Sequence, residues 1–222
     1  SESHNGRGVF GHTRLSILDV SAAGSQPMQS YCGQFLLTFN GEIYNHLEIR
    51  QLLEIRNEGE IKWQSSSDSE TLVNCIACLG IDETLEMING MFAFVVYDVA
   101  NKLIHMARDR YGEKPLYYAF SDSEFSFSSE VRSLKEAQLN DAGINHQGVH
   151  QFFKFGFLTE EHSIYSDIRQ VEPGRVISLG IESWSLSSKQ YWVSKKFLNK
   201  VGKNSSSKML DGQIVNKTRI LL

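Results

Sequence analysis

The sequence predicts an α+β domain, and three observations lead to that fold class. First, three or four strand-like runs follow one another at 91–98, 102–109, 116–120 and 124–129, and their short links favour antiparallel neighbours. Second, the helix-like segments do not alternate with strands in the regular repeat of a parallel sheet. Third, 41% of the 222 residues are hydrophobic, which supplies a substantial core and excludes wholesale disorder.

The first expected elements are a buried strand and the helix that follows it. The strand is expected at 34–40 and runs directly into Gly41. Asn45 then offers an N-cap and Glu48 stands at the capping-box position. Apolar residues recur at helical spacing over 46–56, so this segment is predicted to be a helix.

Two more helices are expected before the strand-rich stretch. Ser67 or Asp68 can cap a helix that ends at Gly80, and Asp82 opens the next one. Beyond the strand-rich stretch, the further expected elements are two helices and one strand, at 130–137, 146–155 and 176–179.

Composition and charge exclude several classes of function. With 22 Lys+Arg against 26 Asp+Glu, the net charge is −4 and no basic block is present, so nucleic acid is not an expected partner. No apolar run approaches the roughly 18 residues of a membrane-spanning helix. The first residues lack the apolar centre of a signal peptide. Three cysteines make a poor disulfide framework, and we therefore expect a cytoplasmic protein.

The composition changes at about residue 195. The run KKFLNKVGKNSSSK is polar, basic and Ser-rich, which is typical of an exposed linker. We therefore expect one domain over 1–194, followed over 195–222 by a linker and the truncated start of a further domain. Because the chain also begins without Met, we interpret it as a fragment truncated at both ends.

The residues Asn40, Gly41 and Glu42, at the end of the first strand, are candidates for chemistry. A strand end that turns at Gly can direct a backbone N–H and an Asn amide at one point, as an oxyanion hole requires. The alternative is an ordinary turn, because Asn-Gly is also the commonest hairpin signal.

Charged residues nearby have two interpretations each. Arg14 beside an apolar run can hold a substrate carboxylate through two parallel hydrogen bonds, or form a surface ion pair with Asp19. Asp68 and Glu70 at the front of a helix can receive a ligand ammonium, or can cap the helix and complement its dipole.

No metal site is expected. Cys75 and Cys78 form a C-x-x-C inside an apolar, helix-like stretch without further ligands nearby, so we interpret them as small apolar helix residues. His146 and His150 are four residues apart, but no third ligand is evident. A glycine-rich phosphate loop is also missing from the sequence.

Taken together, the candidate residues lie in motifs that follow one another in a fixed order. In chain order these are GHTRLSILD (11–19), NGEIYN (40–45), SDSE (67–70), NGMFAFVVYD (89–98) and RDRYGEKPLYY (108–118). From about residue 8 to about 192, the chain resembles the glutaminase domain of class II glutamine amidotransferases, most closely that of glutamine-hydrolysing asparagine synthetases. NGEIYN and RDRxGxKPLYY distinguish this type from the sugar-phosphate and ribosyl-phosphate enzymes.

The resemblance implies a fold and a reaction. The fold is the N-terminal-nucleophile sandwich of four layers, αββα, with two antiparallel sheets between helices. In such domains an N-terminal Cys thiol, deprotonated by its own α-amino group, attacks the side-chain carbonyl of glutamine. Ammonia leaves, and water releases glutamate from the thioester.

The resemblance also assigns the site. The residues assigned to glutamine are Arg14, Leu15, Ser16, Ile17, Leu18, Asn40, Gly41, Glu42 and Asp68. Arg14 would hold the α-carboxylate, while Glu42 and Asp68 would receive the α-ammonium group. The side-chain amide of Asn40 and the N–H of Gly41 would hold the oxyanion, as the catalytic residues of this chain. The domain itself would need no metal or cofactor.

Two parts of the family pattern are not found in this sequence. One is the opening segment with the nucleophilic N-terminal Cys; Cys32, Cys75 and Cys78 do not match its position, so we expect this chain alone to be inactive. The other is the C-terminal synthetase domain, with its ATP and Mg²⁺ sites, where ammonia would convert aspartate to asparagine. The expected partners are therefore L-glutamine and that synthetase domain, with a homodimer as the candidate assembly.

Two alternative functions stay open. The first is an asparagine-synthetase-like amidotransferase with another acceptor, such as a sugar acid, because the acceptor site would lie in the synthetase part. The second is a catalytically inactive glutamine-binding module. A complete set of glutamine-binding residues favours the enzyme, since an inactive module has no need to keep it.

Overall fold

A computed structural model describes residues 2–4, 8–14, 18–19, 21–137, 143–158 and 162–193. The chain divides into two compact units, Ser1–Tyr191 and Trp192–Leu222, and the fold below is that of the first unit. The linker and truncated further domain expected over 195–222 lie outside the described residues and stay a prediction.

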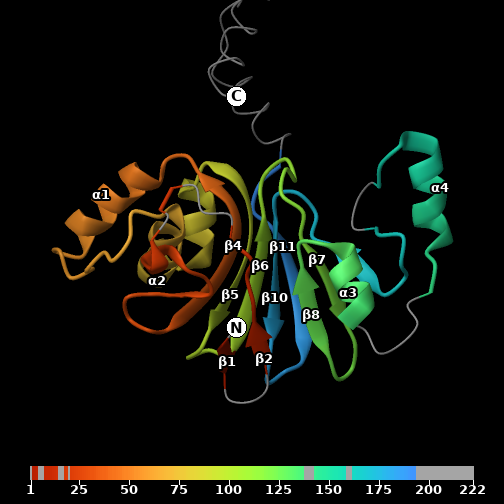
Figure 1. Ribbon diagram of the computed structural model, residues 1–222, viewed down its shortest axis with the longest axis horizontal. Coiled ribbons are helices and arrows are strands. Elements are labelled where there is room, and N and C mark those ends of the chain that lie inside the picture. The colour runs from red at the N-terminus through yellow and green to blue at the C-terminus, as the bar shows by residue number, and fades with distance from the viewer. Residues whose placement is uncertain are drawn as a thin grey trace, which may run out of the picture. The chain divides into compact units, whose positions relative to one another are not determined.

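A six-stranded antiparallel sheet forms the centre of the unit (Figure 1). Its strands, in spatial order, are β11 (Ser185–Gln190), β10 (Arg175–Gly180), β6 (Leu103–Arg108), β5 (Gly90–Asp98), β4 (Phe35–Ile43) and β3 (Met28–Gln29). The longest pairing joins β4 to β5 along all of β4, from Phe35 opposite Asp98 to Ile43 opposite Gly90. The short link from β5 to β6 joins antiparallel neighbours as expected, but the strand expected at 116–120 belongs to a second sheet, so its expected pairing with 102–109 is wrong.

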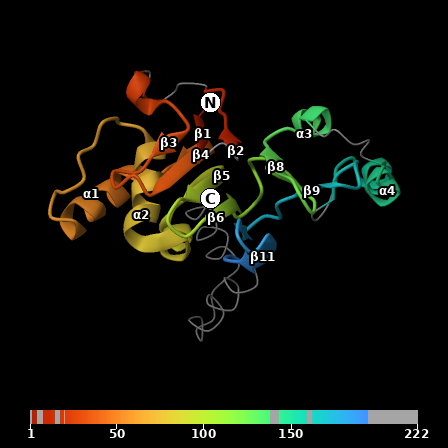
Figure 2. The ribbon, with the colours of Figure 1, turned by 90° about the horizontal axis from the view of Figure 1, so that it is seen from below.

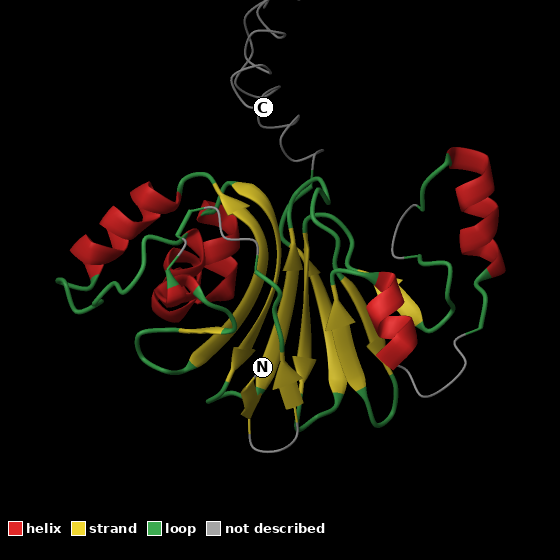
Figure 3. Cartoon of the chain, viewed as in Figure 1, coloured by secondary structure: helices red, strands yellow, loops and turns green. Residues whose placement is uncertain are grey.

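In the described part of the chain, a second antiparallel sheet and four α-helices complete the unit. The strands of the second sheet, in spatial order, are β8 (Phe125–Ser128), β7 (Tyr117–Phe120) and β9 (Ile168–Gln170). The first strands, β1 (Glu2–His4) and β2 (Gly8–Phe10), pair with each other. The helices are α1 (His46–Arg56), α2 (Asp68–Met87), α3 (Val131–Ala137) and α4 (His146–Phe155), and a short 3-10 turn spans Ala22–Gly24 (Figure 3).

Three apolar clusters hold these elements in four layers. The first packs α1 and α2 against the central sheet, for example Leu53 and Ile76 against Leu37. The second lies between the two sheets, and the third packs Leu134 of α3 on Ile168 of the smaller sheet. Seen from below, α1 and α2 lie on one side of the sheets and α3 on the other (Figure 2). The order helix, sheet, sheet, helix confirms the expected αββα sandwich.

The layered packing explains why the central strands are nearly continuous apolar runs. Leu36 faces the cluster between the sheets, whereas its neighbour Leu37 faces the helices, and Phe94 and Val95 alternate in the same way. A strand that is buried on both faces needs apolar side chains at successive positions.

One expectation about the helices is confirmed and one is corrected. Within α2 (Asp68–Met87) two helical segments meet at a kink, and the break lies at Gly80 as expected, where φ is +78°. Asn45 precedes α1 without capping it through its side chain. Its amide instead donates to the Met87 carbonyl and accepts from the Asn89 N–H, which ties the start of α1 to the end of α2.

Among the described residues, none of the helices is long and apolar enough to span a membrane.

Replacing Leu37 by Ala should lower the free energy of unfolding by about 2–5 kcal/mol, because the side chain is fully buried and its loss leaves a cavity. Urea denaturation would measure this effect. Ile55→Ala on α1 is the control, since Ile55 is 78% exposed and its loss should change stability by less than about 0.5 kcal/mol. Equal effects of the two substitutions would contradict the layered core.

Candidate functional site

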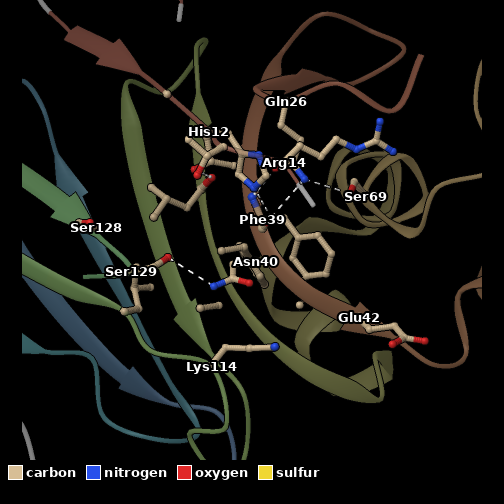
Figure 4. Close-up of a pocket in the computed structure, with 18 of the residues that line it drawn as sticks. His12, Arg14, Gln26, Phe39, Asn40, Glu42, Ser69, Lys114, Ser128 and Ser129 are labelled. Carbon is tan, nitrogen blue, oxygen red and sulfur yellow. Dashed lines mark hydrogen bonds between the residues drawn. The ribbon is translucent and has the colours of Figure 1, made fainter. Parts of the chain in front are cut away.

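A cavity of about 670 Å³ gathers most of the residues that the sequence analysis selected (Figure 4). The selected residues that line it are Arg14, Leu18, Asn40, Gly41, Glu42 and Asp68. They come from three separate parts of the chain: the segment after β2, the strand β4, and the start of α2. Leu15, Ser16 and Ile17 lie outside the described residues, so their assignment to glutamine stays a prediction.

The outer edge of β4 forms one wall of the cavity. Among the described strands only β3 pairs with this edge, through Met28 opposite Leu37 and Gln29 opposite Leu36. Backbone N–H groups on a strand alternate between its two edges. The Phe39 N–H bonds to Gln26 Oε1 at 2.6 Å, and the Ile43 N–H bonds to Asp68 Oδ2 at 3.0 Å. By this alternation the N–H of Gly41, midway between them, points to the same edge.

Gly41 also lets β4 pass close to β5. Its φ is +154°, and a Cβ atom there would lie 2.2 Å from the Met91 carbonyl oxygen. Across the pair, a Cβ on Gly90 would lie 2.0 Å from the Glu42 carbonyl oxygen. Any side chain at either position would push the strands apart at the cavity, so both glycines are required for the shape of this wall.

Asn40 extends its amide into the cavity, where Nδ2 donates a long hydrogen bond, 3.5 Å, to Ser129 Oγ (Figure 4). Asn40 and Gly41 lie within β4, which continues to Ile43. The strand was expected to end at Gly41, and that expectation is wrong, as is the alternative of an Asn-Gly hairpin turn. The amide of Asn40 and the N–H of Gly41 thus border one cavity, and the hydrogen bond from the amide to Ser129 is long.

Asp68 is a buried carboxylate in this wall. Only 6% of its surface is exposed, and burial raises the pKa of the carboxyl, although the hydrogen bond from the Ile43 N–H works in the opposite direction. Ser67 is the N-cap of α2 and accepts from the Glu70 N–H at 3.2 Å, so the interpretation of Asp68 as the cap is wrong.

Glu70 has a different role from Asp68. One of its carboxylate oxygens accepts from the Gln64 N–H, and the other from the N–H and Oγ of Ser65. The carboxylate therefore holds the loop before α2 in place. Of the two acidic residues considered at this helix start, Asp68 borders the cavity and Glu70 supports the loop.

Arg14 is fixed by carbonyl groups. Its guanidinium donates to the Ser21 carbonyl at 2.9 Å and to the Asp19 carbonyl, and a Cβ on Gly24 would lie 2.2 Å from Nη2. The Asp19 carboxylate instead accepts from the N–H groups of Ser21 and Ser66, and these bonds hold its pKa below the usual range. The surface ion pair considered for Arg14 and Asp19 is therefore replaced by backbone contacts, and other guanidinium N–H groups remain to bind a ligand.

The electrostatic arrangement of the cavity is asymmetric. Arg14 supplies a cation, whereas Glu42 and Asp68 supply carboxylates. Such a cavity complements a ligand that carries a carboxylate at one end and an ammonium group at the other.

Several polar residues of the cavity were missed by the sequence analysis, among them His12, Gln26, Ser69 and Lys114. The Nε2–H of His12 donates to the Phe39 carbonyl at 3.0 Å, and burial lowers the pKa of the imidazole, which is therefore neutral at pH 7. Lys114 extends into the cavity below Asn40 in the view of Figure 4. His12, Ser69 and Lys114 belong to motifs quoted above, GHTRLSILD, SDSE and RDRYGEKPLYY, whereas Gln26 carries no local signal for this cavity.

The three cysteines are all described, and none of them lines the cavity. Cys75 is packed in the cluster between helices and sheet, where burial raises its pKa to about 11, so its thiol stays protonated at neutral pH. Cys78 is half-buried on the same helix, and Cys32 is exposed. The interpretation of Cys75 and Cys78 as apolar helix residues agrees with this placement. Within the described part of the chain, no group of three or more ionisable side chains could hold a metal ion.

Comparisons with known proteins agree with this geometry. Residues 3–192 match the model of the glutamine amidotransferase domain family. A relative from Bacillus subtilis strain 168, "Asparagine synthetase [glutamine-hydrolyzing] 1", is 36% identical over 165 residues, covering 74% of this chain and 25% of the relative. The "Putative asparagine synthetase [glutamine-hydrolyzing] 2" of Methanocaldococcus jannaschii is 32% identical over 200 residues, covering 82% of this chain and 37% of the relative. The chain thus spans between a quarter and two fifths of these relatives.

Among solved structures, a glutamine phosphoribosylpyrophosphate amidotransferase from B. subtilis shares the fold. The TM-score is 0.56 at 22% identity, over 82% of this chain and 34% of that one. The sandwich of two antiparallel sheets is thus the fold of an amidotransferase of the N-terminal-nucleophile type. With the family match over residues 3–192, the chain belongs to the class II glutamine amidotransferase domain family.

Proposed function

We propose that the cavity binds L-glutamine and that this domain is the glutaminase part of a glutamine-hydrolysing asparagine synthetase. The observation that carries the proposal is the meeting of Arg14, Asn40, Gly41 and Asp68 in one cavity. These residues supply a cation, an amide with a strand N–H, and a carboxylate. In the same order, they match the α-carboxylate, the side-chain carbonyl and the α-ammonium group of glutamine.

In the proposed reaction, a thiolate attacks the side-chain carbonyl carbon of glutamine. As the carbonyl oxygen gains negative charge, Asn40 Nδ2 and the Gly41 N–H donate to it and lower the energy of the tetrahedral intermediate. The carbon–nitrogen bond then breaks, the leaving –NH2 group takes the proton that the thiol had given to the α-amino group and departs as ammonia, and water hydrolyses the thioester to give glutamate. The thiolate would come from an N-terminal Cys, as the family resemblance implies, because Cys32, Cys75 and Cys78 do not line the cavity.

The rest of the proposal concerns the longer protein. Both relatives described above are named as asparagine synthetases, which supports aspartate as the acceptor of the ammonia. ATP and Mg²⁺ would then act in the synthetase domain, and none of the residues described here is assigned to them. An amidotransferase with another acceptor, or an inactive glutamine-binding module, would have the same glutamine cavity. Experiments on this chain therefore test the glutamine site and not the choice of acceptor.

Calorimetry on the purified chain tests the proposal. The chain should bind glutamine in preference to glutamate and asparagine, and Arg14→Ala or Asp68→Ala should weaken binding at least tenfold, as expected when a charged hydrogen-bond partner worth about 1.5–3 kcal/mol is lost. The matched controls are Arg56→Ala and Asp82→Ala, because both residues form exposed ion pairs outside the cavity. Undiminished glutamine binding by the Arg14 and Asp68 variants would refute this assignment of the cavity.

The oxyanion assignment has a kinetic test in a form of the protein that hydrolyses glutamine. Asn40→Ala removes the side-chain donor and should lower glutaminase turnover by about 10²–10³-fold, with a smaller change in KM, because the bond strengthens only as charge develops. Glutamate release would be the measurement. A variant with unchanged turnover would show that Asn40 is not an oxyanion donor.

The burial of Asp68 predicts that this carboxylate lowers the stability of the fold while it contributes to glutamine binding. Because its pKa is raised in the folded state, the folded protein holds the proton more tightly than the unfolded chain does. The stability contributed by this group therefore falls as pH rises above the unfolded pKa of about 3.9. Asp68→Asn keeps an acceptor for the Ile43 N–H and should raise the melting temperature at pH 7 while it weakens glutamine binding.

Thermal unfolding between pH 3.5 and pH 7.5 would measure this difference in stability. The gain in the Asp68 variant should shrink as pH falls toward the unfolded pKa, and Asp82→Asn, an exposed position on the same helix, should show no such trend. A gain that is independent of pH would contradict the argument from burial.

A further inference from the structure

The side chain of Gln26 occupies a place that the sheet would otherwise fill with backbone. In the pairing of β3 with β4, Met28 lies opposite Leu37 and Gln29 opposite Leu36. Continued by two residues, the same register places Gln26 opposite Phe39. At this point Gln26 pairs through its amide: Oε1 accepts from the Phe39 N–H at 2.6 Å, and Nε2 donates to the Phe39 carbonyl at 3.1 Å. A primary amide thus makes both bonds that a strand residue would make.

The same amide connects β4 to a second wall of the cavity. Nε2 also donates to Ser69 Oγ at 3.3 Å, next to Asp68 at the start of α2 (Figure 4). The Phe39 carbonyl receives a further donor, Nε2–H of His12, from the segment that leads to Arg14. The three parts of the chain that supply the proposed glutamine contacts therefore meet at the Phe39 peptide group.

We propose that Gln26 is a positioning residue of this site. It holds the segment 39–41 at the edge of the sheet, so that the Asn40 amide and the Gly41 N–H keep their direction into the cavity. The inference rests on the proposed function for the identity of the ligand. The pairing of the Gln26 side chain with the backbone of Phe39 rests on the hydrogen bonds alone. Gln26 acts through Asn40 and Gly41, and it needs a donor and an acceptor at one end of its side chain.

The choice of substitutions follows from this requirement. Gln26→Glu keeps the shape but removes both donors and places a carboxylate against the Phe39 carbonyl, whereas Gln26→Leu removes the acceptor as well. Gln29→Glu is the matched control, because Gln29 lies on β3, three residues further along the chain, and its Nε2 donates to the Gly33 carbonyl in an exposed turn. Ser69→Ala removes the contact to α2 and leaves the pairing with Phe39 intact.

The first measurement is amide hydrogen exchange in the 222-residue chain without ligand. Gln26→Leu should accelerate exchange of the Phe39 N–H at least tenfold, while the Leu37 N–H, which faces the β3 backbone, should change much less. Gln29→Glu should leave both rates unchanged. An unaltered Phe39 rate in Gln26→Leu would overturn the proposal.

The second measurement is glutamine binding by calorimetry in the same variants. Gln26→Glu should weaken binding about tenfold or more with a melting temperature close to that of Gln29→Glu, and Ser69→Ala should have an intermediate effect. Faster Phe39 exchange with undiminished affinity would overturn the positioning role. If the unaltered chain bound no glutamine, the proposed function would fail, and the exchange rates together with the Asn40 and Gly41 amide chemical shifts in Gln26→Glu would still decide whether Gln26 fixes this segment.

Discussion

The cavity depends on one constraint, the unfinished outer edge of β4. Backbone N–H and carbonyl groups that leave water need partners, and among the described residues β3 runs beside this edge no further than Leu37. Beyond that point side chains replace the missing strand: Gln26 at Phe39 and Asp68 at Ile43. The Gly41 N–H between them faces the cavity, where a ligand oxygen can accept from it. The edge therefore carries backbone groups that need side-chain partners, and it is also the wall of the cavity where the proposed chemistry takes place.

The use of Asp68 as a backbone partner places a buried, destabilising carboxylate at the proposed ligand site. Asp68 accepts from Ile43, but an amide would do so without the cost of burying a charge, and the pKa of the carboxyl is raised accordingly. Gly41 and Gly90 have no side chains, and this allows β4 and β5 to approach each other closely. These local costs are offset by the two apolar layers on either face of the central sheet. A rigid sheet with covered faces can hold a strained, polar edge in one geometry.

The sequence allowed the layers to be predicted better than the edge. Helix α4 spans the expected residues 146–155, because its periodicity is local. Asn45 has the right type and position for a cap, yet its amide bonds to Met87 and Asn89, which are distant in sequence. The role of Gln26 depends on the register between two strands, and no local pattern carries that information. Arg14, Asn40 and Asp68 were found because motifs mark them, although their meeting in one cavity became visible only in the fold.

The regular repeat of β4 also bears on which amino acid the cavity would prefer. Gly41 and Ile43 are two residues apart on one strand, so their N–H groups are separated by about 7 Å at a rise of about 3.4 Å per residue. Since the Ile43 N–H marks the position of Asp68, this spacing sets the distance between the proposed oxyanion donor and the proposed ammonium acceptor. Asparagine is one methylene shorter than glutamine, and it cannot satisfy both ends of a fixed frame with hydrogen bonds of ordinary length. Loss of a methylene contact alone is worth only about 1–3 kcal/mol, whereas an unpaired polar group in a buried site adds its own desolvation penalty. A preference of the proposed site for glutamine over asparagine would therefore follow from the strand geometry, because the backbone fixes the Gly41 N–H and the Ile43 N–H holds the Asp68 carboxylate in place.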